Sequence, residues 1–471
     1  MTPGTRVLVV GLGVSGEAAA RELLRRGVEV HAVDAAHTPA LAARAEALRD
    51  HGATVLLGRS AAEDVDGVDV VVTSPGVPQD GPVLAAAARR GVPVYSEPEL
   101  AWGLAAGRTR LLAVTGTNGK TTTTELLAAC LGAVAAGNIG TPLVSVLGAD
   151  EPPAVVVAEL SSFQLRFTHT LRPEVAVLLN LAPDHLDWHG GLDGYRAAKA
   201  RVWRWQRPSD WAIVNADDTG AQAAAAAHPP VGRRAAFTLS PPRQGQVGVD
   251  GGVIVTFLDE EPVEVVGVAE LAVRGPHNLA NATAAVAAAC CAGADPRALA
   301  APLRGYQAGA HRLEVVATVD GVVYVNDSKA TNPHAAAAAL ASFAGLGDGG
   351  RVVWIAGGLA KGLTFESLRA EVARCVRAAA TIGTAGPDLA RLVEELGLPV
   401  NRAGTLDVAV RAAAEMARPG DTVLLAPACA SMDQFHDYAE RGRAFRSAVA
   451  ALPRREVVMT SDVARRRSSD Q

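Results

Sequence analysis

A run of small, basic and hydroxyl residues between positions 111 and 125 carries the clearest chemistry in the chain. It reads LLAVTGTNGKTTTTE, an apolar stretch followed by a glycine-containing loop, Lys120 and four threonines. Loop glycines let backbone N–H groups approach phosphate oxygens, and a helix N-terminus adds partial positive charge. We therefore predict a polyphosphate site in which Lys120 reaches the phosphates and the hydroxyl of Thr121 or Thr122 faces Mg²⁺. Val114 stands where the full P-loop pattern has glycine, so the motif is a shortened variant.

Two later segments could complete this site. An apolar strand over 154–158 delivers Glu159, which could bind Mg²⁺ or, because two serines follow, cap a helix. Another strand over 175–179 leads into NLAPDHLDWHG, whose aspartates and histidines suit a hard ion or a phosphoryl group better than a transition metal. Lys199 lies on a segment predicted to be helical, and the residue pattern alone places it on a solvated face.

The N-terminal segment carries a second glycine-rich turn. A strand over 6–10 runs into GLGVSG, and a second strand over 28–33 ends at Asp34. This fingerprint predicts a diphosphate on a helix N-terminus, which fits a nicotinamide or flavin nucleotide with Asp34 on a ribose and fits a UDP-sugar equally well. A third turn, SPG at 74–76, follows the strand over 68–72.

Strands that alternate with helices must position these residues. The alternation predicts parallel sheets with ligands at the carboxyl ends of the strands. We expect an α/β protein of three domains: a Rossmann-like N-terminal domain, a central P-loop ATPase-type α/β domain and a C-terminal Rossmann-like α/β domain. The expected bounds are 1–108, 109–309 and 310–455, with a disordered tail over 456–471.

Composition narrows the class of protein. The chain has 471 residues, 49% of them hydrophobic and 20% charged, with a net charge of −5, which describes a globular protein. A dedicated nucleic-acid surface would need clustered Lys and Arg, so we expect small-molecule partners. The five cysteines are scattered, the N-terminus has no leader pattern and no apolar run approaches the ~20 residues of a membrane helix. We therefore expect a cytoplasmic protein without a membrane partner.

The chain resembles the Mur ligase family in a series of segments, which are, in chain order, GLGVSG, SPG, GTNGKTTT, GNIG, ELSSFQL, DHLDWHG, YRAAKARVW, HNLAN, NDSKATN and PACASMDQF. The segment ELSSFQL most closely resembles the D-glutamate-adding branch of this family. The resemblance implies an ATP-dependent amide ligase of peptidoglycan precursor synthesis. It would phosphorylate the carboxylate of UDP-N-acetylmuramoyl-L-alanine, and D-glutamate would attack the acyl phosphate. It also implies two Mg²⁺ ions, carbon dioxide that carbamylates a lysine, and a monomer.

The resemblance assigns roles to residues that match the family motifs. The catalytic set is Lys120, Glu159, His185 and Lys199, and the metal ligands are Thr121, Glu159, His185 and Lys199 as a carbamate. ATP would contact Gly116, Thr117, Asn118, Gly119, Lys120, Thr121, Thr122, Asn281, Arg312 and Asp327. The UDP substrate would contact Ser15, Asp34, Gly76, Asn138 and His185. D-glutamate would contact Lys329, Thr331, Lys361, Ser431 and Tyr438.

The sequence departs from the family pattern at two places, and three other functions stay open. Ala35 and Ala36 replace the usual Thr-Arg after Asp34, and no aspartate precedes Lys361. Another branch of the family would add a different amino acid. A nicotinamide-dependent dehydrogenase would explain GLGVSG and Asp34 but leave the phosphate loop unexplained. A P-loop switch would hydrolyse ATP without any acceptor.

Overall fold

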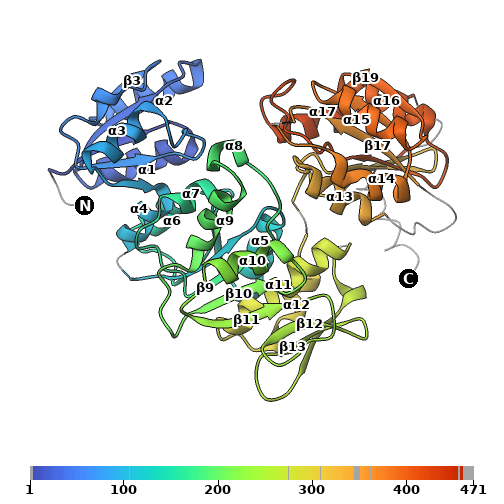
Figure 1. Ribbon diagram of the computed structural model, residues 1–471, viewed down its shortest axis with the longest axis horizontal. Helices are drawn as coiled ribbons and strands as arrows, with labels where there is room; N and C mark the ends of the chain where they lie inside the picture. The colour runs from blue at the N-terminus through green and yellow to red at the C-terminus, as the bar shows by residue number, and fades with distance from the viewer. Residues whose placement is uncertain are drawn as a thin grey trace. The chain divides into compact units, whose positions relative to one another are not determined.

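The computed structural model describes residues 4–105, 107–273, 275–307, 309–343, 351–360 and 362–453, and the backbone of 457–459. The chain forms two compact units, Met1–Ala272 with Ala280–Tyr306, and Val273–Leu279 with Gln307–Gln471. The first unit holds two sheets and the second unit holds one (Figure 1). Each unit is described by itself.

The N-terminal sheet has five parallel strands in the order β3-β2-β1-β4-β5. The helices that alternate with them give the predicted βαβ pattern. The four valine and leucine side chains of β1 are almost fully buried, because helices cover both faces of a doubly wound sheet. The elements are β1 (Arg6–Val10), α1 (Val14–Arg25), β2 (Glu29–Asp34), α2 (Pro39–Asp50), β3 (Thr54–Leu57), β4 (Val70–Thr73), α3 (Pro82–Arg90) and β5 (Val94–Ser96).

The central sheet has nine strands in the order β14-β13-β12-β11-β10-β9-β6-β8-β7. It is parallel from β7 to β12, and β12, β13 and β14 pair antiparallel. Its strands are β6 (Arg110–Thr115), β7 (Val134–Gly137), β8 (Val155–Glu159), β9 (Val175–Leu178), β10 (Trp211–Asn215), β11 (Arg233–Phe237), β12 (Gln246–Asp250), β13 (Val253–Phe257) and β14 (Val263–Gly267). Its helices are α5 (Lys120–Leu131), α6 (Leu143–Leu147), α7 (Ser162–Arg166), α8 (Leu186–His189), α9 (Leu192–Ala200), α10 (Thr219–Ala227), α11 (Pro276–Cys291) and α12 (Ala300–Gly305).

The C-terminal sheet has seven strands in the order β19-β18-β17-β20-β16-β15-β21. Five strands are parallel, and β15 pairs antiparallel with β16 and β21. The strands are β15 (Glu314–Val319), β16 (Val322–Asn326), β17 (Val352–Gly357), β18 (Val376–Ile382), β19 (Val400–Gly404), β20 (Thr422–Leu425) and β21 (Val457–Met459). The helices are α13 (Pro333–Ala341), α14 (Arg369–Cys375), α15 (Gly386–Glu395), α16 (Leu406–Met416) and α17 (Tyr438–Ala450). Strand β21 is the described part of the tail, and the other residues of 456–471 lie outside the described residues.

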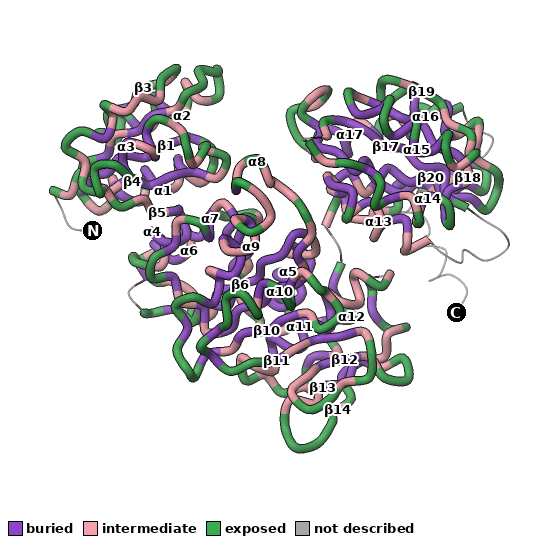
Figure 2. Tube along the Cα trace, in the orientation of Figure 1, coloured by how far each residue is buried: buried purple, intermediate pink, exposed green. Residues whose placement is uncertain are grey.

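Buried residues follow the strands of all three sheets, and exposed residues follow the loops and the outer helix faces (Figure 2). The predicted three-domain α/β fold is confirmed. In the part of the chain that the structure describes, no helix is long and apolar enough to cross a membrane.

Helix α4 (Glu97–Ala105) joins the two sheets of the first unit. The Glu97 carboxylate accepts the backbone N–H of Val144 in α6, and Glu99 accepts backbone N–H groups from the turn 169–171. Arg25 of α1 donates to Gly148 O at 2.7 Å. Helices α1, α4 and α6 therefore attach the N-terminal sheet to the central sheet.

Candidate active site

The phosphate loop connects the buried strand β6 to helix α5. Gly119 precedes the helix with φ of +82°, a left-handed conformation that favours glycine. Gly119 stands at the position before α5 and makes no side-chain capping bond to the helix. A methyl group at Gly119 would lie 2.2 Å from Asn281 Oδ1 in α11. The structure thus brings Asn281 against the loop.

Polar groups from the loop after β9 and from α9 fix the shape of the phosphate loop. Asn180 Oδ1 accepts the backbone N–H of Asn118 at 2.9 Å, and Asn180 Nδ2 donates to Asn118 O at 3.1 Å. Thr117 Oγ1 donates to Ala182 O at 3.1 Å and lies 3.0 Å from the hydroxyl of Tyr195. The loop conformation is therefore held by side chains from later in the sequence.

Two lysines converge on one carbonyl of the loop. Lys120 Nζ donates to Gly116 O at 2.9 Å and Thr117 O at 2.8 Å, and Lys199 Nζ donates to Gly116 O at 2.7 Å. Burial lowers the pKa of Lys120, and it lowers that of Lys199 well below its ordinary value, to which the nearby charge of Lys120 also contributes. Lys199 is only 1% exposed, so its placement on a solvated helix face is wrong.

Glu159 ends strand β8 next to the loop. Its carboxylate accepts Thr121 Oγ1 at 2.7 Å and Asn138 Nδ2 at 2.9 Å. Ser161 and Gln164 form the capping box of α7, so Glu159 does not serve as the cap. Within the described residues no three His, Cys, Asp or Glu side chains form a metal cluster. The Thr121 hydroxyl and the Glu159 carboxylate nevertheless fit Mg²⁺, which usually takes one or two protein oxygens together with phosphates and water.

The loop after β9 and helix α8 bring carboxylate and imidazole groups close to Lys120 and Lys199. The charges of Asp184 and Glu159 act on both Lys120 and Lys199. His185 directly precedes α8 with φ of +51° and makes no side-chain capping bond, and its Nε2 lies 3.6 Å from Asp184 Oδ1. Burial, followed by the charges of Lys199 and His185, lowers the pKa of His189 to about 4. His189 is therefore near both His185, which precedes α8, and Lys199, which lies in α9.

In the N-terminal sheet, the turns after β1, β2 and β4 meet. Ser74 Oγ donates to Gly11 O at 2.7 Å, and a methyl group at Gly16 would lie 1.9 Å from the same oxygen. Both carboxylate oxygens of Asp34 accept backbone N–H groups, from Leu12 at 2.7 Å and from Ala36 at 2.9 Å. The structure therefore uses Asp34 to hold the first turn. Ser15 lies in the first turn of α1, and Gly76, with φ of +93°, lies in the turn after β4.

In the C-terminal sheet, four of the residues predicted to bind D-glutamate lie on the loops after β16 and β20 and at the start of α17. Lys329 Nζ lies 5.2 Å from the ring centroid of Tyr438, Thr331 N donates to Lys329 O at 2.8 Å, and Ser431 is buried. Lys361 lies outside the described residues. The predicted ATP-binding residue Asp327 is also here; burial raises its pKa to about 7, although Arg312 and Lys329 act in the opposite direction.

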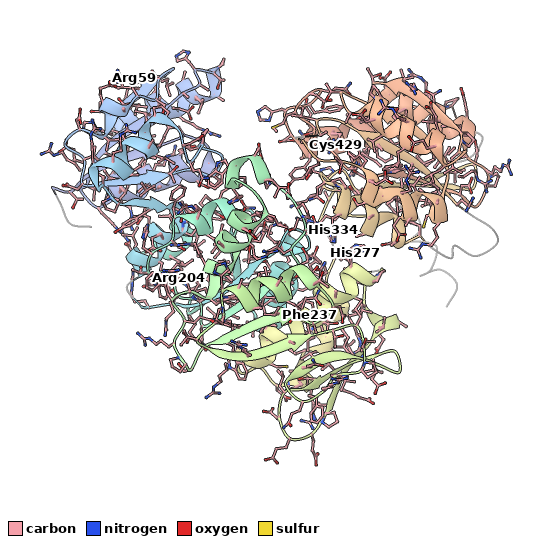
Figure 3. All side chains as sticks on the ribbon, in the orientation of Figure 1. Arg59, Arg204, Phe237, His277, His334 and Cys429 are labelled. Carbon is pink, nitrogen blue, oxygen red and sulfur yellow. The ribbon has the colours of Figure 1, made fainter. Side chains whose placement is uncertain are left out.

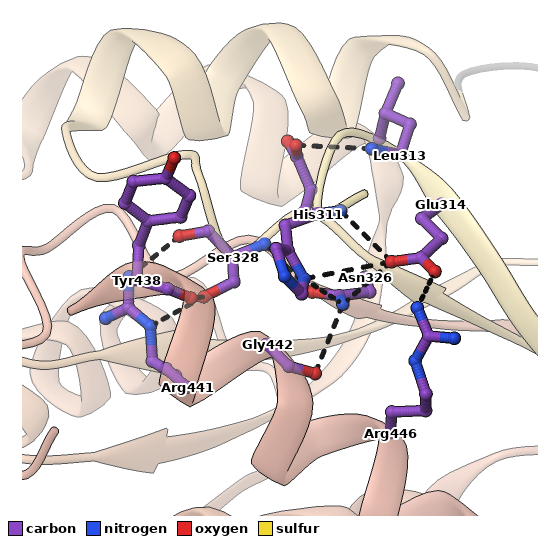
Figure 4. Close-up of polar contacts among 10 residues, drawn as sticks. His311, Leu313, Glu314, Asn326, Ser328, Tyr438, Arg441, Gly442 and Arg446 are labelled. Atoms are coloured by element: carbon purple, nitrogen blue, oxygen red, sulfur yellow. Dashed lines mark hydrogen bonds and ion pairs between the residues drawn. The ribbon is translucent and has the colours of Figure 1, made fainter. Parts of the chain in front are cut away.

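Arg441 ties these loops together, and the sequence analysis missed it. Its guanidinium donates to Ser328 Oγ at 3.0 Å and Ser328 O at 2.9 Å (Figure 4). It also donates to Cys429 O at 3.1 Å. Burial lowers its pKa to about 10. The acceptors are neutral oxygens, and the arginine joins the loop after β16 to the loop after β20.

His277, near the start of α11, lies in the second unit (Figure 3). Its Nδ1 is 3.2 Å from Ser342 Oγ at the end of α13. Burial lowers its pKa to about 4, so the ring is neutral near pH 7. This geometry makes His277 a packing residue of the second unit.

Comparison with known proteins found matches over most of the chain. Three family models match, described as the Mur ligase MurD-like N-terminal domain over 5–96, the Mur ligase middle domain over 114–289 and the Mur ligase glutamate ligase domain over 311–429. A UDP-N-acetylmuramoylalanine–D-glutamate ligase of Frankia casuarinae is 50% identical, over 95% of this chain and 94% of the relative. One of Thermobifida fusca is 45% identical, over 95% and 99%.

The solved structure of UDP-N-acetylmuramate–alanine ligase from Thermotoga maritima shares the fold, with a TM-score of 0.60 at 19% identity over 95% of this chain and 99% of that chain. The chain belongs to the Mur ligase family. It is an ATP-dependent ligase, and the relatives that resemble it at 40–50% identity carry the name of the D-glutamate ligase.

Proposed function

We propose that the chain joins D-glutamate to UDP-N-acetylmuramoyl-L-alanine at the expense of ATP, in the cytoplasm and as a monomer. The observation that carries the proposal is the convergence of Lys120, Lys199, Glu159 and Asp184 on one phosphate loop, in a chain that resembles D-glutamate ligases over 95% of its length. An amide ligase of this kind transfers the γ-phosphoryl group to a carboxylate and then lets an amine displace phosphate.

Phosphoryl transfer needs positioning and charge neutralisation more than it needs a nucleophilic side chain. Lys120 would exchange its bonds to the loop carbonyls for phosphate oxygens, and the N-terminus of α5 would hold the same group. Thr121 and Glu159 would hold one Mg²⁺, and His185 with Lys199 would face a second. Bound Mg²⁺ would neutralise charge on the transferring phosphoryl group.

Lys199 would act as a carbamate. Its neutral amine would attack the carbon of CO₂, forming an N–C bond while one C–O π bond becomes a carboxylate and the amine loses a proton to solvent. Burial and the charge of Lys120 support this step, because both lower the pKa of Lys199 and so favour the neutral amine. The product would replace a cation with hard oxygen donors suited to Mg²⁺.

The remaining residues would bind the two organic substrates. Ser15, Asp34 and Gly76 would receive the UDP group, with Asp34 acting through the turn that it braces, and Asn138 would lie near the sugar. In the other unit, Lys329, Thr331, Lys361, Ser431 and Tyr438 would hold D-glutamate, whose two carboxylates suit cationic side chains. Arg312 and Asp327 would contact ATP together with Asn281.

The test is phosphate release from ATP and Mg²⁺ with UDP-N-acetylmuramoyl-L-alanine, with D-glutamate present, absent, or replaced by L-glutamate and other amino acids. We expect release that requires both substrates and selects D-glutamate. Release with a different amino acid would assign another branch of the family. Release without any amino acid would contradict the ligase proposal and assign a P-loop switch.

A further inference from the structure

The indole of Trp188 joins a loop of the N-terminal sheet to a loop of the central sheet. Trp188 Nε1 donates to Val77 O at 3.0 Å, and Gln79 Nε2 donates to Trp188 O at 2.8 Å. Val77 and Gln79 belong to the loop that begins with the SPG turn after β4, and Trp188 lies in α8, three residues after His185. Two bonds that run in opposite directions fix one loop against the other. We call this pair of bonds the Trp188 clasp.

The same ring lies in an aromatic cluster that reaches the phosphate loop. Phe163 contacts the Trp188 ring edge-on, with 4.8 Å between the ring centroids, and its centroid lies 4.7 Å from that of His185. Phe163 therefore contacts both rings. His189 contacts Trp188 at 4.6 Å and Tyr195 at 5.2 Å. The Tyr195 hydroxyl lies 3.0 Å from Thr117 Oγ1 in the phosphate loop. Because these rings are packed together, a shift of the Trp188 ring would displace both His185 and the phosphate loop.

The clasp is not what attaches the two domains to each other. The contacts of Glu97 with Val144, of Glu99 with the turn 169–171 and of Arg25 with Gly148 already join them through α1, α4 and α6. The clasp adds a connection between two specific loops, the SPG loop and the loop that carries His185. A contact that served only to hold the domains together would not need to join these loops.

We infer that Trp188 is a positioning residue, which holds the loop that receives the UDP end of the substrate at a fixed distance from the loop where its carboxylate is phosphorylated. The inference rests on the proposed function. A substrate that is held at both ends reacts only if the two ends of its site are correctly spaced, and a displacement of about 1 Å can cost about a hundredfold in rate. The clasp fixes that spacing through groups that do not touch the reacting atoms.

The experiment compares Trp188→Phe, which keeps an aromatic ring but loses the N–H donor, with Gln79→Ala and with the double variant. Trp205→Phe is the matched control, because that indole is 41% exposed and contacts Arg204 on the same domain. The measurements are KM for each substrate, kcat, the Kd of UDP-N-acetylmuramoyl-L-alanine by calorimetry without ATP, and Tm. We expect each single variant to raise KM and Kd for the UDP substrate about fivefold while KM for ATP and Tm stay as in the control. In the double variant the two effects should be less than multiplicative.

Three results would overturn the inference. Unchanged KM, Kd and kcat in Trp188→Phe would mean that the clasp does not position the substrate. An equal rise in KM for all substrates together with a lower Tm would mean a structural role alone. Effects of Trp188→Phe and Gln79→Ala that multiply without coupling would mean that the two bonds act separately. If the unaltered protein neither binds nor turns over the UDP substrate, the proposed function itself fails, which is a separate outcome.

Discussion

Lys120 and Lys199 donate to the same acceptor, the carbonyl oxygen of Gly116, at 2.9 and 2.7 Å. Two ammonium groups this close disfavour each other's charge, and burial adds to the effect. Burial lowers the pKa of Lys120, and burial together with the charge of Lys120 holds the pKa of Lys199 well below its ordinary value. The site therefore favours one cation and one neutral amine.

The first prediction concerns CO₂ and pH. We expect Lys199→Ala and Lys199→Arg each to lose at least about a hundredfold in kcat, because neither side chain forms the carbamate that would hold Mg²⁺. In the unaltered enzyme, removal of CO₂ should lower activity and bicarbonate should restore it. Recovery should weaken as the pH falls through the lowered pKa of Lys199, because protonation removes the nucleophilic amine. The intact mass of the unaltered enzyme at neutral pH should show the carbamate. Full activity of Lys199→Arg in CO₂-free buffer would contradict the carbamate proposal.

The second prediction concerns the phosphate loop. We expect Gly119→Ala to abolish nucleotide binding, because the new methyl group would lie 2.2 Å from Asn281 Oδ1 and φ is +82°. Gly132→Ala at the other end of α5 is the control, with φ of +58° and no atom within 4 Å of the added carbon. The control should cost about 1 kcal/mol of stability and leave ATP affinity unchanged. Calorimetric titration with an ATP analogue distinguishes the two variants. Equal affinities would show that the close approach of Asn281 to Gly119 does not matter for nucleotide binding.

The third prediction concerns the cation that joins the two loops of the C-terminal sheet. Arg441→Met should lower stability by about 3 kcal/mol, because it leaves Ser328 O and Cys429 O buried without their donor. KM for D-glutamate should rise while KM for ATP changes less, since Lys329 follows Ser328 directly and Ser431 lies two residues after Cys429. Arg443→Met, on the exposed face of the same helix, should change neither quantity. A normal KM for D-glutamate in Arg441→Met would show that the loops hold their positions without it.

The fourth prediction concerns Glu97, which is buried at the junction of α4 with α6. Burial raises its pKa from 4.5 to about 7, so the folded state binds more protons than the unfolded state between those values and stability falls as pH rises through that window. Glu97→Gln should therefore raise stability at pH 8 by about 1–3 kcal/mol and leave it nearly unchanged near pH 4.5. Thermal unfolding at both pH values, with the exposed Glu46→Gln as control, measures this. A gain that is equal at both pH values would exclude titration of Glu97 as the cause.

The sequence predicted best what is encoded locally. The order of strand, glycine loop and helix around Lys120 requires only neighbouring residues, and β6 and α5 lie where the apolar run and the threonines place them. Lys199 shows the limit, since a helical lysine gives no sign of which face a distant loop will cover. Arg441 was missed for the same reason, because Ser328, which accepts two of its hydrogen bonds, lies 113 positions away in the sequence.

Asp34 shows a different limit. Its spacing after the glycines predicted a contact with a ribose or a related group, which stays a prediction, and both of its oxygens also accept N–H groups of the chain itself. A side chain that shapes a ligand turn and one that touches the ligand can stand at the same position of a motif, and residue type does not separate them. Trp188 was overlooked because an aromatic residue in a loop more often only packs.

The strand order β3-β2-β1-β4-β5 has a consequence for how binding at the N-terminal sheet can evolve. The connections from β1 and β4 leave in opposite directions, and where neighbouring connections part, a parallel sheet is open at its carboxyl edge. That opening is a property of the winding of the chain and not of any side chain. Ala35 and Ala36 change the side chains that follow β2, but they leave the strand order, and therefore the opening at this edge, unchanged.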